Sequence, residues 1–255
     1  MVQESIAKGD ELCQNINLEI FVLNRQKGNM YEFVTHTWNP IRGKCPHNCQ
    51  YCFMIPLWDR MKSQKQVFDE KTMNDNLGTN NFIFVGSSTD MWANDVPSEW
   101  IADVLLQCNK FPDNTYLFQS KNPERFQEFQ RMFPKNTILG TTIETNRENI
   151  IAEISKAPSI QSRISFMTLA KLFVPKKEIM VTIEPILDFD LNPFIRSLKL
   201  IKPKWVNIGA DSKGHNLPEP SKEKVLALLV ALKEFTEVKQ KSNLRRIIKK
   251  KEQNL

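Results

Sequence analysis

Six short apolar runs, separated by segments with helical character, are the feature that most constrains the fold of this 255-residue chain. Runs rich in β-branched residues are typical of strands buried in a parallel sheet. Because parallel neighbours need a crossover between them, a helix is expected after each strand. We predict strands at residues 32–37, 81–87, 115–120, 137–143, 179–183 and 205–208.

Apolar residues at helical spacing predict the connecting helices, and capping or proline residues precede several of them. Right-handed crossovers would curve such a sheet, so we predict an α/β fold with a partial (β/α)6 TIM-type barrel. Active sites of barrels lie at the C-terminal ends of the strands, and polar residues follow five consecutive predicted strands here. The predicted helices are residues 98–108, 124–132, 147–154, 194–200 and 222–239.

The positive charge of the chain is concentrated at its C-terminus. Residues 238–255 hold seven basic residues and one acidic residue, which accounts for the whole formal net charge of +6. We therefore expect an N-terminal extension at 1–30, a barrel at 31–237 and a basic tail at 238–255. Basic tails bind polyanions by releasing counterions, but they also serve simply as solvated ends, and the sequence leaves both roles open.

The hydropathy of the chain predicts a cytoplasmic protein without a membrane partner. No run is apolar over the roughly 18 residues that a membrane span requires. The polar first residues lack the apolar core of a secretory signal. In a reducing compartment, clustered cysteines bind metal or perform chemistry more often than they form disulfides.

Three of the five cysteines, Cys45, Cys49 and Cys52, lie within eight residues just after the first predicted strand. Three thiolates on one loop can converge on a single soft metal centre. Iron–sulfur clusters usually take four cysteines, so a set of three leaves one iron open to a ligand. Cys13 and Cys108 stand alone and are expected to be inert thiols.

A zinc site is the alternative interpretation of the three cysteines. A structural zinc site is closed by four protein ligands, and no second pair of ligands follows the cysteines at a typical distance along the chain. In this alternative, His47 would complete the site of a non-catalytic module that binds zinc and, through the tail, nucleic acid. Otherwise His47 is expected to lie exposed on the cysteine loop.

The Cys-x3-Cys-x2-Cys spacing, with Tyr51 before the last cysteine, resembles the signature of radical S-adenosylmethionine (radical SAM) enzymes. The resemblance covers residues 32–208 approximately. Segments 37–40, 89–92, 120–123, 182–185 and 208–211 resemble more narrowly an uncharacterised, partly phage-borne radical SAM family. The chain is also similar to the spore photoproduct lyase group in having a lysine after the third predicted strand.

This resemblance implies a [4Fe-4S] cluster on Cys45, Cys49 and Cys52, with S-adenosylmethionine (SAM) chelated by the fourth iron. One electron would cleave SAM to methionine and a 5′-deoxyadenosyl radical, which abstracts hydrogen from a substrate. A nucleic acid or nucleotide is the substrate class that the lyase similarity and the basic tail favour. An electron donor such as a flavodoxin or ferredoxin is also implied.

The resemblance also suggests which residues contact SAM. Lys121 corresponds to the lysine that pairs with the SAM carboxylate, and a cation suits that anion. Ser87 or Ser88 would bind the SAM amino group, although this chain lacks the Gly-Gly-Glu-like segment found there in the superfamily.

Three further residues are expected at the same mouth. Tyr51 would set the loop conformation and offer its backbone to adenine. Glu144 would accept hydrogen bonds from the ribose hydroxyls, or cap a helix. Glu184 would serve SAM or the substrate, or pair with a lysine of the barrel.

Overall fold

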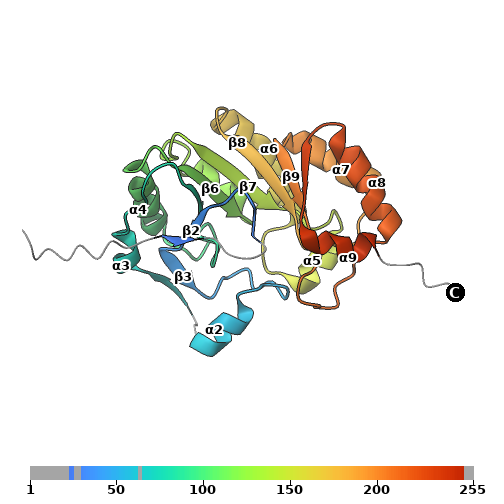
Figure 1. Ribbon diagram of the computed structural model, residues 1–255, viewed down its shortest axis with the longest axis horizontal. Helices are drawn as coiled ribbons and strands as arrows, with labels where there is room; N and C mark the ends of the chain where they lie inside the picture. Colours follow the sequence, from blue (N-terminus) through green and yellow to red (C-terminus); the bar gives the residue numbers. More distant parts are fainter. Residues whose placement is uncertain (1–22, 26–29, 63–64, 250–255) are drawn as a thin grey trace, which may run out of the picture.

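The computed structural model of the protein describes residues 23–25, 30–62 and 65–249. Its centre is an eight-stranded sheet in which every strand except β1 runs parallel to its neighbours (Figure 1). In spatial order the strands are β1 (Asn24–Arg25), β2 (His36–Trp38), β5 (Phe82–Val85), β6 (Thr115–Ser120), β7 (Thr137–Thr142), β8 (Glu178–Ile183), β9 (Trp205–Ile208) and β10 (Glu237–Gln240).

All six predicted strands are present, as β2 and β5 to β9, and the fold is the predicted α/β partial barrel of TIM type. The bounds of β6 and β9 agree with the prediction, whereas β2 starts later than residue 32. The reason is a turn before it, in which the Val34 N–H donates to the Tyr31 carbonyl at 3.0 Å. The six strands follow one another in the sheet in chain order, so their C-terminal ends meet at one mouth.

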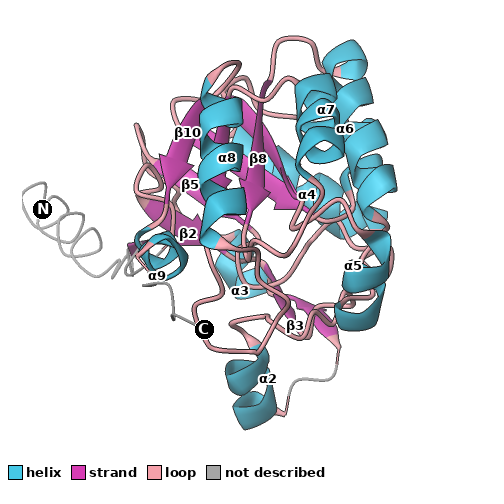
Figure 2. Ribbon diagram, turned by 90° about the vertical axis from the view of Figure 1, so that its right-hand side faces the viewer, coloured by secondary structure: helices cyan, strands magenta, loops and turns pink. Residues whose placement is uncertain are grey.

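Helices connect the parallel strands and cover the outer face of the curved sheet (Figures 1 and 2). Three predicted helices are confirmed as α4, α5 and α7, while the one expected at 124–132 is a short 3-10 helix, η1. The long helix α6 was not predicted. The connecting helices are α4 (Ser98–Asn109), η1 (Pro123–Gln127), α5 (Glu148–Ile154), α6 (Ile160–Phe173), α7 (Leu191–Ile201) and α8 (Lys222–Lys233).

The prediction of one helix over residues 222–239 is wrong at its C-terminal end. Helix α8 ends at Lys233, and β10 then adds a seventh parallel strand beside β9. Two short helices follow, η2 (Ser242–Leu244) and α9 (Arg245–Ile248), in which Leu244 and Ile247 are buried. The boundary expected between barrel and tail at 237/238 therefore falls inside β10, and residues up to 248 pack on the barrel.

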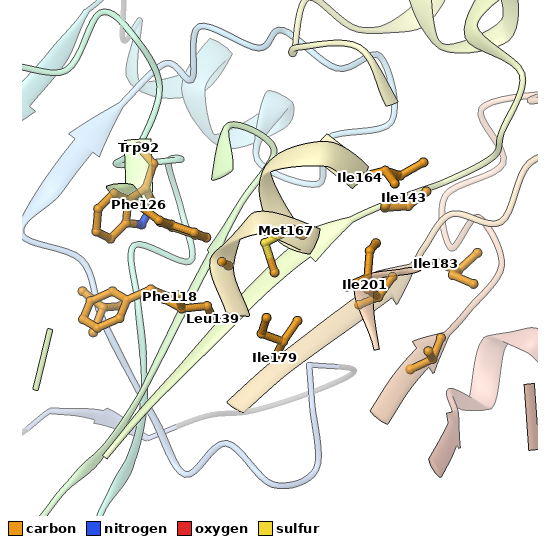
Figure 3. Packing of buried hydrophobic residues seen from close by; sticks show 14 of the residues in the cluster. Trp92, Phe118, Phe126, Leu139, Ile143, Ile164, Met167, Ile179, Ile183 and Ile201 are labelled. Carbon is orange, nitrogen blue, oxygen red and sulfur yellow. The ribbon is translucent and has the colours of Figure 1, made fainter. Parts of the chain in front are cut away.

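The main core lies between the outer face of the sheet and the helices (Figure 3). Successive strand residues point to opposite faces, so Leu139 joins this core while Ile138 belongs to a second, smaller cluster. The smaller cluster also contains Tyr31, Met180 and Trp205. None of the described helices is long and apolar enough to cross a membrane.

A small excursion between β2 and β5 carries the cysteines. It contains a two-stranded antiparallel sheet of β3 (Ile41–Gly43) and β4 (Gln66–Phe68). Helices α2 (Ile55–Met61) and α3 (Glu70–Met73) belong to the same excursion, which projects beyond the mouth of the barrel (Figure 2).

Candidate metal and cofactor site

The three cysteines lie on the loop between β3 and α2. Cys49 is buried, and Cys45 and Cys52 are half-buried. Two tight turns shape the loop, because the Asn48 N–H donates to the Cys45 carbonyl at 3.3 Å and the Cys52 N–H donates to the Cys49 carbonyl at 3.0 Å. The thiol of Cys49 also lies 3.1 Å from Ser155 Oγ.

Backbone hydrogen bonds fasten this loop to the C-terminal end of α5. The Gln50 N–H donates to the Ile154 carbonyl at 2.9 Å, and the Lys156 N–H donates to the His47 carbonyl at 2.7 Å. Because α5 follows β7, these bonds hold the cysteine loop at the C-terminal mouth of the barrel.

The three thiols share one low-dielectric neighbourhood. Burial, together with the charges of Asp90 and Cys49, raises the pKa of Cys45 to about 12. Burial also raises the pKa of Cys52, to which Cys49 adds. Such an environment disfavours free thiolates, whereas a bound cation would reverse the balance.

The donor set fits an iron–sulfur cluster held by three cysteine thiolates, since these are soft ligands on one short loop. Among the described residues, no three His, Cys, Asp or Glu side chains already surround a metal position. His47 Nε2, which the zinc alternative would use, lies 2.8 Å from Asp90 Oδ2.

Asp90, in the loop after β5, joins three segments of the site. Its carboxylate accepts hydrogen bonds from the Ser120 hydroxyl at 2.9 Å and from the Lys121 N–H at 2.8 Å. Its contact with His47 explains why the expectation of an exposed histidine is wrong: His47 is buried because it has a buried carboxylate as partner. Asp90 thus fixes the cysteine loop relative to the ends of β5 and β6.

Lys121, Glu144 and Tyr51, which the sequence predicted at one mouth, form a buried polar network. The ammonium of Lys121 donates to Glu144 Oε1 at 2.8 Å and to the Tyr51 hydroxyl at 2.7 Å. Tyr51 also donates to Glu144 Oε1. On the other carboxylate oxygen, Arg163 donates to Glu144 Oε2 at 2.8 Å.

The electrostatics of this network keep Glu144 ionised. Burial opposes ionisation, but the cations of Lys121 and Arg163 outweigh it and lower the pKa of Glu144 to about 2. Two cations around one carboxylate leave a net positive charge beside the thiols. Both Glu144 oxygens are engaged and the side chain is fully buried, so a contact with ribose would require one of these bonds to open.

Ser87 and Ser88 lie at the end of β5, where Gly86 has a φ of +75° that favours glycine. The Ser87 hydroxyl and the Ser88 N–H both donate to Asn39 Oδ1, at 3.1 Å and 2.9 Å. The Ser88 hydroxyl is buried and has no hydrogen-bond partner in the described structure. A buried hydroxyl without a partner is costly, and a polar ligand such as an amino group would satisfy it.

Glu184 lies apart from this network, at the end of β8, and it pairs with the C-terminal segment. Its carboxylate accepts hydrogen bonds from Lys241 Nζ at 2.8 Å and from Asn243 Nδ2 at 3.0 Å. The lysine that pairs with Glu184 is therefore Lys241 of the C-terminal segment, and not a lysine of the predicted barrel at 31–237. Gly209 makes room, because a Cβ there would lie 2.8 Å from Glu184 Oε1.

Arg163 is the site residue that sequence reasoning missed. It is fully buried on α6, and besides Glu144 it donates to the carbonyls of Thr142 and Pro158. The available signal was its position: Ile160, Arg163, Ile164 and Met167 form one buried stripe, and a charge within such a stripe requires a buried partner.

A sequence profile described as "Protein of unknown function (DUF5131)" matches residues 29–225. The chain belongs to the DUF5131 family. The match includes the cysteine loop and every strand from β2 to β9. No curated protein matches the sequence of this DUF5131 chain.

Solved structures resemble the DUF5131 chain in fold. Spore photoproduct lyase complexed with dinucleoside spore photoproduct has a TM-score of 0.61 and 10% identity, covering 87% of this chain and 79% of that one. A spore photoproduct lyase mutant with bound AdoMet and dinucleoside spore photoproduct has a TM-score of 0.53 and 11% identity, and the match covers 82% of this chain and 64% of that one. Streptococcus suis SuiB bound to S-adenosylmethionine has a TM-score of 0.52 and 10% identity, and the match covers 93% of this chain and 54% of that one. At such identities the likeness shows the fold alone.

Proposed function

We propose that this DUF5131 protein is a radical SAM enzyme that binds a [4Fe-4S] cluster through Cys45, Cys49 and Cys52. The observation that carries the proposal is the place of the cysteine loop, fastened to α5 at the mouth of a partial barrel beside the Lys121–Glu144 pair. When bound, the cluster supplies the electron that cleaves SAM to methionine and a 5′-deoxyadenosyl radical. Two neighbours of this fold were solved with SAM, which supports the same cofactor here.

In this proposal, Lys121 binds the carboxylate of SAM. An ammonium has three N–H donors, and Lys121 uses two of them on Glu144 and Tyr51, which leaves one for an anion. Glu144, whose other oxygen is held by Arg163, holds that ammonium in place from the buried side. The unpartnered Ser88 hydroxyl supports the assignment of Ser87 and Ser88 to the amino group. Tyr51 orients the loop.

We assign Glu184 to the substrate side of the mouth, because its partners come from the C-terminal segment rather than from the cysteine loop. A nucleotide or nucleic acid is the proposed substrate class. The dinucleoside spore photoproduct bound by spore photoproduct lyase and the basic residues after β10 support it.

Metal analysis tests the proposal. The protein is reconstituted anaerobically with iron and sulfide, and iron, sulfide and zinc are then quantified alongside the Cys49→Ala variant. The proposal expects iron and sulfide in equal amounts, close to four of each per chain, with a large loss in the variant. A colourless protein that retains stoichiometric zinc would instead establish the metal-binding module.

A single-stranded oligonucleotide then tests the substrate class. SAM consumption should rise when the oligonucleotide is added to the reduced, reconstituted protein. No change with DNA, RNA or nucleotides would remove the nucleic-acid assignment and leave the cofactor chemistry standing.

A further inference from the structure

A groove of about 550 Å³ lies beside the cysteine loop and is bordered by Cys45. Its walls come from the cysteine loop, the start of β4, the segment before α4 together with the first turn of α4, and Lys156 just after α5. Lys44, Lys65 and Lys156 line it, together with the half-buried ring of Trp100.

The groove is positively charged. Lys44, Lys65 and Lys156 are exposed, and none of them forms an ion pair with another residue of the described chain. Asp95 is the acidic residue in its lining. Three free cations against one carboxylate favour an anionic partner, and a half-buried aromatic ring among them is typical of protein interfaces.

The groove is separate from the proposed SAM site. Its lining includes Cys45 but none of the proposed SAM contacts Ser87, Ser88, Lys121 and Glu144. A protein seated in the groove would therefore approach the metal ligands without entering the mouth, where SAM and substrate are proposed to bind.

We infer that this groove docks an acidic electron-donor protein that carries a flavin or an iron–sulfur centre; the inference rests on the proposed function. The donor is oxidised by one electron, and the centre held by the three cysteines is reduced by one. No bond forms or breaks in this transfer. Docking beside Cys45 shortens the path of the electron from the donor to the metal centre. It also leaves the mouth of the barrel free for SAM and substrate.

Charge reversal tests the docking site. Lys65→Glu combined with Lys156→Glu changes two groove lysines and leaves Lys44, the neighbour of Cys45, in place. A flavodoxin is titrated onto reconstituted wild-type and variant protein by calorimetry at low and high salt. The variant should bind about tenfold more weakly or worse at low salt, and the difference should shrink as salt screens the charges.

The matched control is Lys176→Glu with Lys233→Glu, two exposed lysines outside the groove that should leave flavodoxin binding unchanged. SAM cleavage driven by dithionite, which needs no docking site, should be equal in all three proteins. If dithionite drives no cleavage even in wild type, the proposed function fails. If it drives cleavage but the groove variant binds flavodoxin normally, the docking site is wrong. Normal flavodoxin binding with lost oligonucleotide binding would instead assign the groove to nucleic acid.

Discussion

Asp90 Oδ2 lies 2.8 Å from His47 Nε2, and this contact ties the cysteine loop to the barrel. Burial opposes ionisation of Asp90, but His47 and the backbone donors outweigh it, so the pKa of Asp90 is lowered. The ionised carboxylate thus fixes a loop that has little regular structure of its own. The position of the cysteine loop at the mouth therefore depends on this tie as well as on the backbone bonds to α5.

Replacing Asp90 by alanine should lower the free energy of unfolding by about 3 kcal/mol, because it leaves several buried donors without an acceptor. Urea denaturation of the metal-free protein measures the loss. The control is Asp103→Ala, an exposed carboxylate on α4, for which little change is expected. Equal stability of the two variants would mean that Asp90 does not hold the loop.

Glu144→Gln tests the buried network through its pH dependence. The folded-state pKa of Glu144 is about 2, below its ordinary value of 4.5. Its ionisation therefore contributes stability that is fully present above pH 4.5 and is lost as the pH falls toward 2. We expect the variant to be less stable than wild type at about pH 7. Between about pH 5 and about pH 3 the variant should lose less stability than wild type. Parallel pH profiles of the metal-free proteins would contradict the assignment.

Lys121→Ala should weaken SAM binding by about 1–3 kcal/mol, the contribution of one hydrogen bond to a charged group. Iron content should stay at the wild-type level, because the cysteine ligands lie on a different loop. Calorimetric titration of SAM onto the reconstituted proteins measures the change. Lys110→Ala, at the C-terminal cap of α4, is the control. Unchanged SAM affinity in Lys121→Ala would move the carboxylate contact elsewhere.

The C-terminal segment should contribute to stability, contrary to a tail that is merely solvated. Leu244 is 1% exposed, so Leu244→Ala should cost about 2–5 kcal/mol in unfolding free energy. Leu226→Ala, at 40% exposed, should cost less. Truncation after Val238 would remove Leu244 and also Lys241, the partner of Glu184. A truncated protein as stable as the full chain would show that this packing is unimportant.

The central strands were predictable because each is a short apolar run with clear polar borders. The strand β10 was not, since Val225, Leu228, Leu229 and Leu232 set a helical spacing that no glycine or proline ends. Its own residues, Glu237–Gln240, are mostly charged or polar and gain their structure by pairing with β9. Tertiary pairing decided this element against its local pattern.

The positions of the candidate residues were predictable, because the three cysteines share one loop and Lys121 and Glu144 follow the ends of β6 and β7. The partners of these residues were not predictable in the same way. Arg163 comes from α6, a helix that was not predicted, and the His47–Asp90 contact joins residues 43 positions apart. Such contacts depend on how the loops fold over the mouth.

The most direct test of the account is release of 5′-deoxyadenosine, measured by mass spectrometry after anaerobic reconstitution and addition of dithionite and SAM. Wild type and Cys108→Ala should release it together with methionine, and Cys45→Ala, Cys49→Ala and Cys52→Ala should not. The account would be contradicted by S-adenosylhomocysteine as the product, or by equal 5′-deoxyadenosine release from wild type and Cys49→Ala.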